Sequence, residues 1–287
     1  MRKTVSLWLV AVLLAACGRP SPSATPGRPG TPALAPAQLT TVTPAATAAS
    51  QAAVTPTGPV ATVVRSTSDV PVAVTITAGD GAKLSGEFYP PVAVTRVAGQ
   101  KAPGVLLLHG VGGSHADWDA FARQLQSQGM AALALDFRGS GASPGPADWN
   151  KSVDDTRAAW QALLAWPGVD PQRTAIVGAS IGANLALIVG ANNNQAAAVA
   201  ALSPGDDFQG LQPTGLLGNF GSRPVYLIAS QDDAYSYASA QHMAPHLPAG
   251  ETLYYTNTGH GTAMFANPDL ATRLLSWLGV KIGDAKG

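Results

Sequence analysis

Ser180 stands in a pattern that could make its hydroxyl a nucleophile. It lies in Gly178-Ala179-Ser180-Ile181-Gly182, which has the spacing G-x-S-x-G. A short apolar run with β-branched residues, 174–177, comes before the pattern, and a second apolar run, 183–189, follows it. Strand, tight turn and helix is the context in which such a serine is pushed outward, because only glycine fits the crowded positions beside it. We therefore predict that Ser180 projects from a sharp turn at a strand end.

A serine hydroxyl needs a base within hydrogen-bonding reach, and histidine is the usual choice because its pKa lies near the working pH. His260 stands between two glycines in Thr258-Gly259-His260-Gly261, so its loop can approach the nucleophile closely. The other four histidines have simpler explanations: a loop-holding role for His109, a loop position that could touch substrate for His115, and a surface helix for His242 and His246. We predict His260 as the base.

The base needs a carboxylate to fix its tautomer and to stabilise its protonated form. Asp232 and Asp233 follow an apolar run at 224–229, and Asp206 and Asp207 follow the preceding apolar run at 196–202. Both pairs are expected at strand ends. From the residues alone, both pairs are candidates for the acid.

The rest of the folded part alternates strands and helices. Residues 70–77 alternate apolar and polar side chains, and with 83–89 they predict a hairpin. Strands are expected at 103–108, 130–135, 174–177, 196–202, 224–229 and 252–256, and helices at 121–128, 153–166, 183–189, 238–247 and 268–278. This order predicts an α/β fold, with a mostly parallel sheet covered by helices on both faces. Sites in such sheets form beyond the carboxyl ends of the strands.

Five features together resemble the α/β-hydrolase family. They are HGVGG at 109–113, DFRGSGAS at 136–143, GASIG at 178–182, an acid-bearing loop after the PVYLIAS run at 224–230, and GHG at 259–261. The last three follow that family's chain order of nucleophile, acid and histidine. The resemblance implies that Ser180 is the nucleophile and His260 the general base. It puts the acid at Asp233, with Asp232 the near alternative and Asp207 the remoter one.

The same resemblance implies an oxyanion hole made by the backbone N–H groups of Val111 and Ile181. It assigns Asp136 and Arg138 to a structural loop, and it requires neither metal nor cofactor. The connection at 204–222 is short, so we expect little or no cap. The pattern is most similar to the dienelactone-hydrolase-like and small carboxylesterase branches, although dienelactone hydrolase has cysteine at the position of Ser180.

The resemblance implies a serine hydrolase that cleaves small or medium carboxylic esters through an acyl-enzyme intermediate. Two alternatives stay open. One is a peptidase of the prolyl-oligopeptidase type, which shares the triad. The other is a non-catalytic, envelope-associated protein that keeps the fold.

The charge balance and the cysteine count of the chain exclude some classes of partner and of metal site. The 287-residue chain has a formal net charge of zero, and only 12% of its residues are charged. A nucleic-acid-binding protein would carry a basic face, so we expect none of that activity. The single cysteine excludes an internal disulfide and a cysteine-based metal cluster.

The position of that cysteine indicates export and anchoring to a membrane. Arg2 and Lys3 precede an apolar run at 5–16, which suits a secretory signal better than a membrane span. The run ends in Leu14-Ala15-Ala16-Cys17, which resembles the lipobox of bacterial lipoproteins. In that family the cysteine is acylated. We therefore predict that residues 1–17 are a lipoprotein signal peptide, and that the protein is exported and anchored through lipid on Cys17 to the bacterial cell envelope.

Residues 18–68 are rich in Pro, Thr, Ala and Ser and contain no aromatic residue. Such a segment buries too little surface to offset its chain entropy, so we predict a disordered tether. Residues 69–287 are then the catalytic domain, and its partner is a small-molecule ester.

Overall fold

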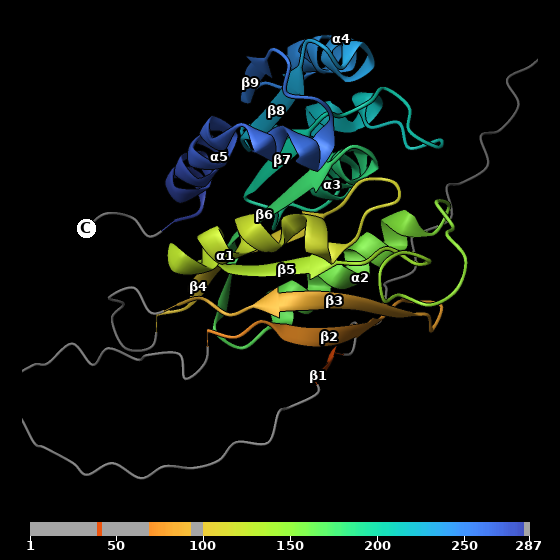
Figure 1. Ribbon diagram of the computed structural model, residues 1–287, viewed down its shortest axis with the longest axis vertical. Helices are drawn as coiled ribbons and strands as arrows, with labels where there is room; N and C mark the ends of the chain where they lie inside the picture. Colours follow the sequence, from red (N-terminus) through yellow and green to blue (C-terminus); the bar gives the residue numbers. More distant parts are fainter. Residues whose placement is uncertain (1–38, 42–68, 93–99, 284–287) are drawn as a thin grey trace, which may run out of the picture. The chain divides into compact units, whose positions relative to one another are not determined.

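The protein is described by a computed structural model that covers residues 39–41, 69–92 and 100–283 (Figure 1). The predicted signal peptide and Cys17 lie outside the described residues. So does most of the predicted tether at 18–68. Three of the tether residues are described: strand β1 (Leu39–Thr41) pairs antiparallel with β2.

A nine-stranded sheet forms the centre of the described chain, in the order β1-β2-β3-β5-β4-β6-β7-β8-β9. The strands after β1 are β2 (Val72–Thr77), β3 (Lys83–Tyr89), β4 (Ala102–Leu108), β5 (Ala131–Leu135), β6 (Val169–Ala179), β7 (Ala198–Leu202), β8 (Val225–Ser230) and β9 (Gly250–Tyr255). The hairpin β2–β3 joins the sheet antiparallel to β5, and all pairs from β5 to β9 are parallel. The predicted mostly parallel α/β sheet is confirmed.

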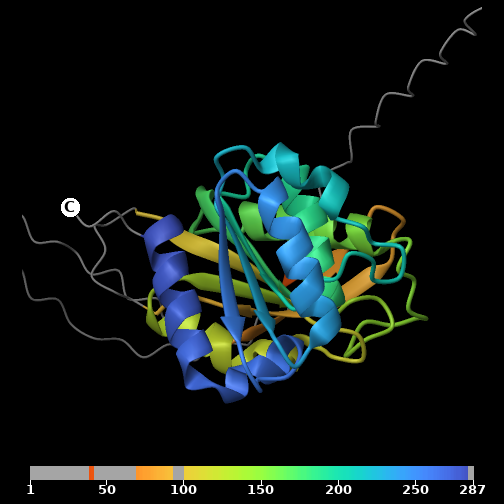
Figure 2. The same cartoon turned by 90° about the horizontal axis from the view of Figure 1, so that it is seen from above.

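Helices cover both faces of this sheet (Figure 2). The α-helices are α1 (Asp119–Ser127), α2 (Ser152–Ala165), α3 (Ile181–Ala191), α4 (Ala234–Met243) and α5 (Pro268–Lys281), and the 3-10 helices are η1 (His115–Trp118), η2 (Thr214–Phe220), η3 (Ala244–His246) and η4 (Gly261–Ala266). Helices α2, α3 and α4 pack in one hydrophobic cluster, and α1 and α5 pack in the other.

Strand β4 shows how the sequence specifies this layering. All seven of its residues are buried. Leu106 and Leu108 belong to the cluster with α2 and α3, whereas Val105 and Leu107 belong to the cluster with α1 and α5. Side chains alternate across a strand, so a continuous apolar run supplies both faces at once. Each such side chain contributes about 1.5–3 kcal/mol when fully buried.

Two elements differ from their predicted bounds in ways that bear on the site. Helix α4 begins at Ala234, four residues before its predicted start, so Asp233 becomes its N-cap. Strand β6 begins at Val169, five residues before its predicted start. The connection at 204–222 carries only η2 and a tight turn, and η2 packs beside α3. The expectation of little or no cap therefore agrees with the described chain.

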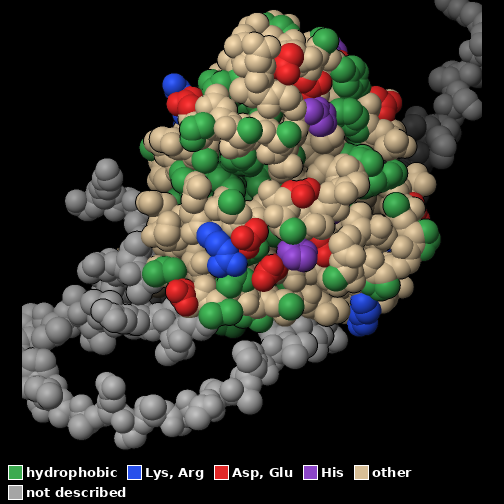
Figure 3. Space-filling model, in the orientation of Figure 1, with side chains coloured by type: hydrophobic (Ala, Val, Ile, Leu, Met, Phe, Trp, Pro, Cys, Tyr) green, Lys and Arg blue, Asp and Glu red, His purple; other side chains and the backbone are tan. Residues whose placement is uncertain are grey.

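The surface view agrees with the balanced composition. On the face in Figure 3, Lys and Arg side chains occur singly or beside Asp and Glu, and they do not gather into a basic patch. Within the ranges that the structure describes, no helix has the length and apolar character needed to cross a membrane.

Candidate active site

Ser180 occupies the turn between β6 and α3. Its backbone has φ 57° and ψ −124°, which is a strained conformation for a residue with a Cβ. The Ser180 amide donates to the carbonyl of Leu202 at 2.8 Å, and the Ser180 carbonyl accepts from Ala183 at 2.8 Å. These bonds to β7 and α3 fix the turn, so the serine is held at the carboxyl end of the central strands.

The two glycines of the motif are required by space. A Cβ on Gly178 would overlap the carbonyl group of Gly182. A Cβ on Gly182 would lie 2.6 Å from the carbonyl oxygen of His109. Both distances are too short for any side chain, because the obstructing atoms are backbone. The predicted steric reason for the G-x-S-x-G pattern therefore holds in the structure.

His109 organises the loop beside the serine. It is fully buried, its Nδ1 donates to the carbonyl of Gly110 at 2.6 Å, and its Nε2 accepts from the Phe137 amide at 3.1 Å. Burial lowers the pKa of His109. A neutral imidazole with both nitrogens occupied has no lone pair left for a substrate, so its role is to hold the loop, as predicted.

The two predicted oxyanion donors lie on the loops that meet at Ser180. Ile181 is the first residue of α3, where backbone N–H groups have no partner inside the helix. Within the part of the chain that the structure describes, the Val111 amide donates to no protein group. A Cβ on Gly110, the residue before Val111, would lie 3.3 Å from the Ser180 Cβ. Both amides are therefore available to a group bound at Ser180.

Asp233 and His260 are in direct contact. His260 Nδ1 lies 2.6 Å from Asp233 Oδ2. Burial alone would raise the pKa of Asp233, but hydrogen bonds from His260 and Ser236 outweigh it and the net shift is downward. The carboxylate is thus charged at neutral pH. It can hold a proton on Nδ1 and leave Nε2 free to accept one.

The loop of His260 reaches the nucleophile. A Cβ on Gly261 would be 3.6 Å from Ala179 Cβ and 3.9 Å from Ser180 Cβ, so the backbone after His260 packs on the elbow. Among the described residues, Ser180 Oγ forms no hydrogen bond with His260. Catalytic hydrogen bonds are commonly loose without substrate and tighten in the complex.

Asp232, the near alternative for the acid, is used differently. Its Oδ2 accepts from the Gly259 amide at 3.1 Å, and its Oδ1 accepts from the Thr258 amide at 3.3 Å and from the Ser230 hydroxyl. These bonds, led by that from Ser230, lower the pKa of Asp232. Asp232 therefore fixes the backbone of the histidine loop and leaves the imidazole to Asp233.

Asp207, the remoter alternative, lies in another loop. Its carboxylate accepts from the Gly210 amide at 2.7 Å and from Gln212 at 2.6 Å. The hydrogen bond from Gln212, followed by that from Gly210, lowers its pKa. Among the aspartates proposed from sequence, the structure brings Asp233 alone to the imidazole of His260.

Two serines that the sequence analysis did not single out also hold the histidine loop. Ser203, after β7, accepts from the Gly261 amide at 2.9 Å and is fully buried. Ser230, the last residue of β8, accepts from the Thr258 amide at 3.1 Å. The amides on either side of His260 are therefore anchored to two neighbouring strand ends. Their position at the ends of apolar runs is the sequence feature from which both serines could have been predicted to lie near the site.

Removal of the Ser203 hydroxyl tests this anchoring. We expect Ser203→Ala to lower kcat about tenfold with little change in KM, because the buried Gly261 amide loses its acceptor and the imidazole is held less well. The unpaired amide costs about 1–3 kcal/mol of stability. Steady-state kinetics and thermal unfolding measure both effects.

Ser203→Gly is the matched control. Ser203 has φ 51°, so glycine relieves backbone strain while it removes the same hydroxyl. It should lose as much kcat as Ser203→Ala but less stability. A kcat that follows stability across the two variants, and not the hydroxyl, would contradict a positioning role.

Asp136, Arg138 and His115 form structural contacts that, among the described residues, do not include Ser180. Asp136 accepts from the Ala142 amide at 2.9 Å and lies 3.0 Å from His115 Nδ1, while His115 Nε2 lies 3.3 Å from a carboxylate oxygen of Glu87. Arg138 pairs with the buried Asp155 at 2.5 Å. Both nitrogens of His115 are thus engaged by carboxylates, which leaves none for a substrate.

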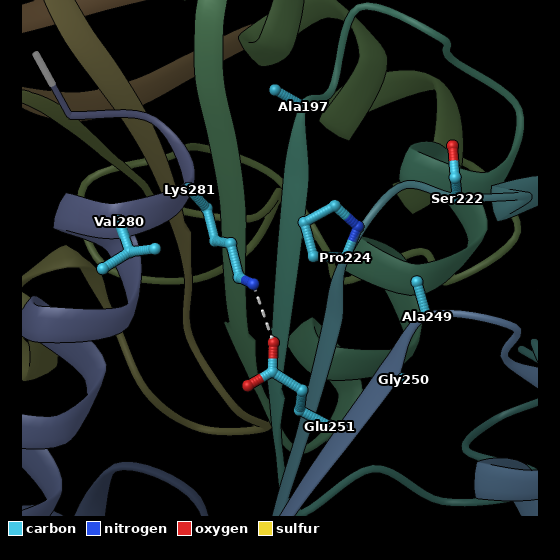
Figure 4. A pocket seen from close by; sticks show the side chains of 8 residues that line it. All are labelled: Ala197, Ser222, Pro224, Ala249, Gly250, Glu251, Val280 and Lys281. Atoms are coloured by element: carbon cyan, nitrogen blue, oxygen red, sulfur yellow. Dashed lines mark ion pairs between the residues drawn. The ribbon is translucent and has the colours of Figure 1, made fainter. Parts of the chain in front are cut away.

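A cavity of about 620 Å³ lies at the opposite edge of the sheet (Figure 4). Ala197, Pro224 and Gly250, at the amino ends of β7, β8 and β9, line it. Its charged groups, Glu251 and Lys281, pair with each other at 3.0 Å. Its one hydroxyl, on Ser222, has no histidine among the lining residues to activate it. The cavity lies at the amino ends of these strands, whereas Ser180 lies at the carboxyl end of β6.

Comparisons with known proteins agree with this fold. The family model described as serine aminopeptidase, S33, matches residues 99–213. That range includes Val111 and Ser180 but ends before Asp233 and His260. An uncharacterised protein of Mycobacterium tuberculosis is 33% identical over 114 residues, which are 40% of this chain and 39% of that protein. The chain spans about two fifths of the length of the curated relatives it matches.

Solved structures match over more of the chain. An esterase of Pyrococcus furiosus has a TM-score of 0.61 at 21% identity and covers 74% of this chain and 91% of its own. Dienelactone hydrolase of Anabaena variabilis has a TM-score of 0.57 at 20% identity and covers 74% of this chain and 96% of its own. The topology and these likenesses together show that the chain has the α/β-hydrolase fold.

Proposed function

We propose that the protein is a serine hydrolase that cleaves small or medium carboxylic esters, with Ser180 as nucleophile, His260 as general base and Asp233 as the acid that orients it. The observation that carries the proposal is the 2.6 Å contact between His260 and Asp233, on a loop whose backbone packs against the strained turn of Ser180. Nucleophile, base and acid thus come from the ends of three strands of one sheet.

The chemistry follows from this arrangement. His260 Nε2 takes the proton of the Ser180 hydroxyl as Oγ attacks the ester carbonyl carbon, and Asp233 stabilises the imidazolium. The tetrahedral intermediate collapses when its bond to the alcohol oxygen breaks and His260 donates the proton to that oxygen. Water then attacks the acyl-serine with His260 as base again, and the acid leaves.

The negative oxygen of the intermediate would be bound by the amides of Val111 and Ile181. Ile181 also begins α3, so the helix dipole favours negative charge there. Loss of one such donor typically costs about 3 kcal/mol of transition-state stabilisation. No metal is needed for this step, because two amides and the helix end supply the positive field.

Hydrolysis by the purified protein tests the proposal. We expect turnover of p-nitrophenyl acetate and butyrate, and covalent labelling by a fluorophosphonate on the peptide that contains Ser180. Alanine p-nitroanilide and short peptide amides are the comparison substrates. Efficient cleavage of the peptide amides would favour the peptidase, because serine peptidases also cleave activated esters and the esters alone do not separate the two. An absence of both labelling and turnover would favour the non-catalytic alternative.

We also propose that the hydrolase is exported and lipid-anchored to the bacterial cell envelope through Cys17. The support is the sequence Leu14-Ala15-Ala16-Cys17 after an apolar run. Incorporation of a labelled fatty acid in a bacterial host tests this. The label should be present on the wild type and absent from Cys17→Ser, and equal labelling of both would refute the anchor.

A further inference from the structure

A small hairpin after β7 presents an aromatic ring to His260. Phe208 and Leu211 exchange two backbone hydrogen bonds, at 3.3 and 2.9 Å, and form an isolated antiparallel bridge. The two residues between them, Gln209 and Gly210, have φ values of 56° and 83°. Positive φ at both central positions is the geometry of a tight two-residue hairpin turn.

The buried side-chain amide of Asn184 holds the hairpin through three hydrogen bonds. Asn184, on α3 one turn after Ser180, is fully buried. Its Nδ2 donates to the carbonyls of Gly205 and Leu211, each at 2.7 Å, and its Oδ1 accepts from the Gly205 amide at 2.9 Å. Both ends of the hairpin segment are therefore tied to the helix that begins at the nucleophile.

Tyr235 on α4 holds the hairpin segment at Asp207 and Phe208. Its hydroxyl donates to the carbonyl of Asp207 and accepts from the Asp207 amide, both at 2.9 Å. The rings of Phe208 and Tyr235 meet edge to face with centroids 5.5 Å apart. Both rings lie over Gly205, where a Cβ would come within 2.7 Å of Phe208 and 2.8 Å of Tyr235. A larger residue at 205 would displace the pair.

This aromatic pair stands next to the base. The Phe208 ring lies 6.3 Å from the imidazole of His260, at an interplanar angle of 87°. Tyr235 follows Asp233 by two residues and is 48% exposed, and Val111 on the oxyanion loop is 63% exposed. Two of the five large apolar side chains exposed in the described chain thus flank this site. A rigid apolar surface beside a catalytic group is ready to bind part of a substrate.

We propose that Phe208 and Tyr235 form the wall of a subsite for the alcohol part of the ester, and that this subsite selects alcohols with a planar aromatic ring, such as benzyl alcohol. The inference rests on the proposed function. His260 must deliver its proton to the leaving alcohol oxygen, so the alcohol lies on the His260 side of the scissile bond. The wall stands on that side, and an aromatic alcohol can pack edge to face against it.

Benzyl and ethyl acetate test the subsite. The two share an acyl group, and their alcohols are similarly poor leaving groups, so the ratio of their kcat/KM values reports binding of the alcohol. We expect the wild type to favour benzyl acetate and Phe208→Ala to reduce that ratio about tenfold. Phe208→Leu, which keeps bulk without a ring, should fall between them. Cyclohexylmethyl acetate, apolar but not planar, should show a smaller change than benzyl acetate.

Three controls separate the explanations. Fluorophosphonate labelling of Ser180 in Phe208→Ala shows whether the variant is folded and retains its nucleophile. Val280→Ala, an exposed apolar residue on α5 near the opposite edge, should leave the benzyl-to-ethyl ratio unchanged. The ratio of ethyl butyrate to ethyl acetate, which varies the acyl part, should be the same in wild type and Phe208→Ala.

The outcomes are distinct. An equal benzyl-to-ethyl ratio in wild type and Phe208→Ala, with labelling intact, would overturn the subsite and leave the proposed esterase standing. A change in the butyrate-to-acetate ratio instead would mean that the wall contacts the acyl part, which also overturns the proposal. A wild type that neither labels nor hydrolyses any of the esters would refute the proposed function itself.

Discussion

Ser180→Ala is expected to lower kcat for p-nitrophenyl butyrate by about 10⁶-fold, since removal of the nucleophile of a serine triad costs about that much. The loss follows from the geometry: the side chain at 180 stands on the turn that faces the histidine loop, and its backbone is fixed by bonds to Leu202 and Ala183. A methyl group there keeps the turn but has no lone pair. Fluorophosphonate labelling should disappear together with turnover.

Ser276→Ala is the matched control, because it makes the same serine-to-alanine change at an exposed position on α5. It should keep full activity. Thermal unfolding shows whether Ser180→Ala is folded, and its midpoint should stay within a few degrees of the wild type. Residual turnover above about 1% of wild type in a folded Ser180→Ala protein would contradict a role for Ser180 as nucleophile. Such turnover would exceed the expected residual activity by about four orders of magnitude.

The sequence predicted those features of the site that depend on local pattern. The elbow at 178–182 could be predicted from its two glycines together with the apolar runs on either side, because the crowding at Gly178 and Gly182 leaves room for glycine alone. The mostly parallel sheet with helices on both faces followed from the alternation of strands and helices. The buried strands were recognisable because a strand covered on both faces, such as β4, is apolar throughout.

Features that depend on contacts between distant segments were not predicted. The N-cap role of Asp233 was missed because the first turn of α4 contains no apolar periodicity. The anchoring of the histidine loop by Ser203 joins residues 58 positions apart, and nothing near either one signals the other. The hairpin at Phe208 depends on Asn184, whose buried amide looks in the sequence like any polar residue of a helix.

Asp233→Asn is expected to lower kcat about 10⁴-fold, the size of effect that follows when the histidine of a triad is held in the wrong tautomer. Asp233 Oδ1 accepts from the Ser236 amide, and Oδ2 accepts from His260 Nδ1. In asparagine the carbonyl oxygen stays with Ser236, so the NH₂ group faces His260. It donates to Nδ1, moves the ring proton to Nε2, and leaves no lone pair to take the proton of Ser180.

Asp232→Asn distinguishes this role from its neighbour's. The Asp232 carboxylate accepts from the Thr258 and Gly259 amides, and asparagine keeps one of its two acceptor oxygens. We expect a loss of kcat of about tenfold or less, because the loop is loosened but the imidazole keeps its tautomer. Steady-state kinetics on both variants measure the order. A larger loss in Asp232→Asn than in Asp233→Asn would mean that Asp232 is the acid of the triad. Only the residue that contacts His260 Nδ1 can control which ring nitrogen carries the proton.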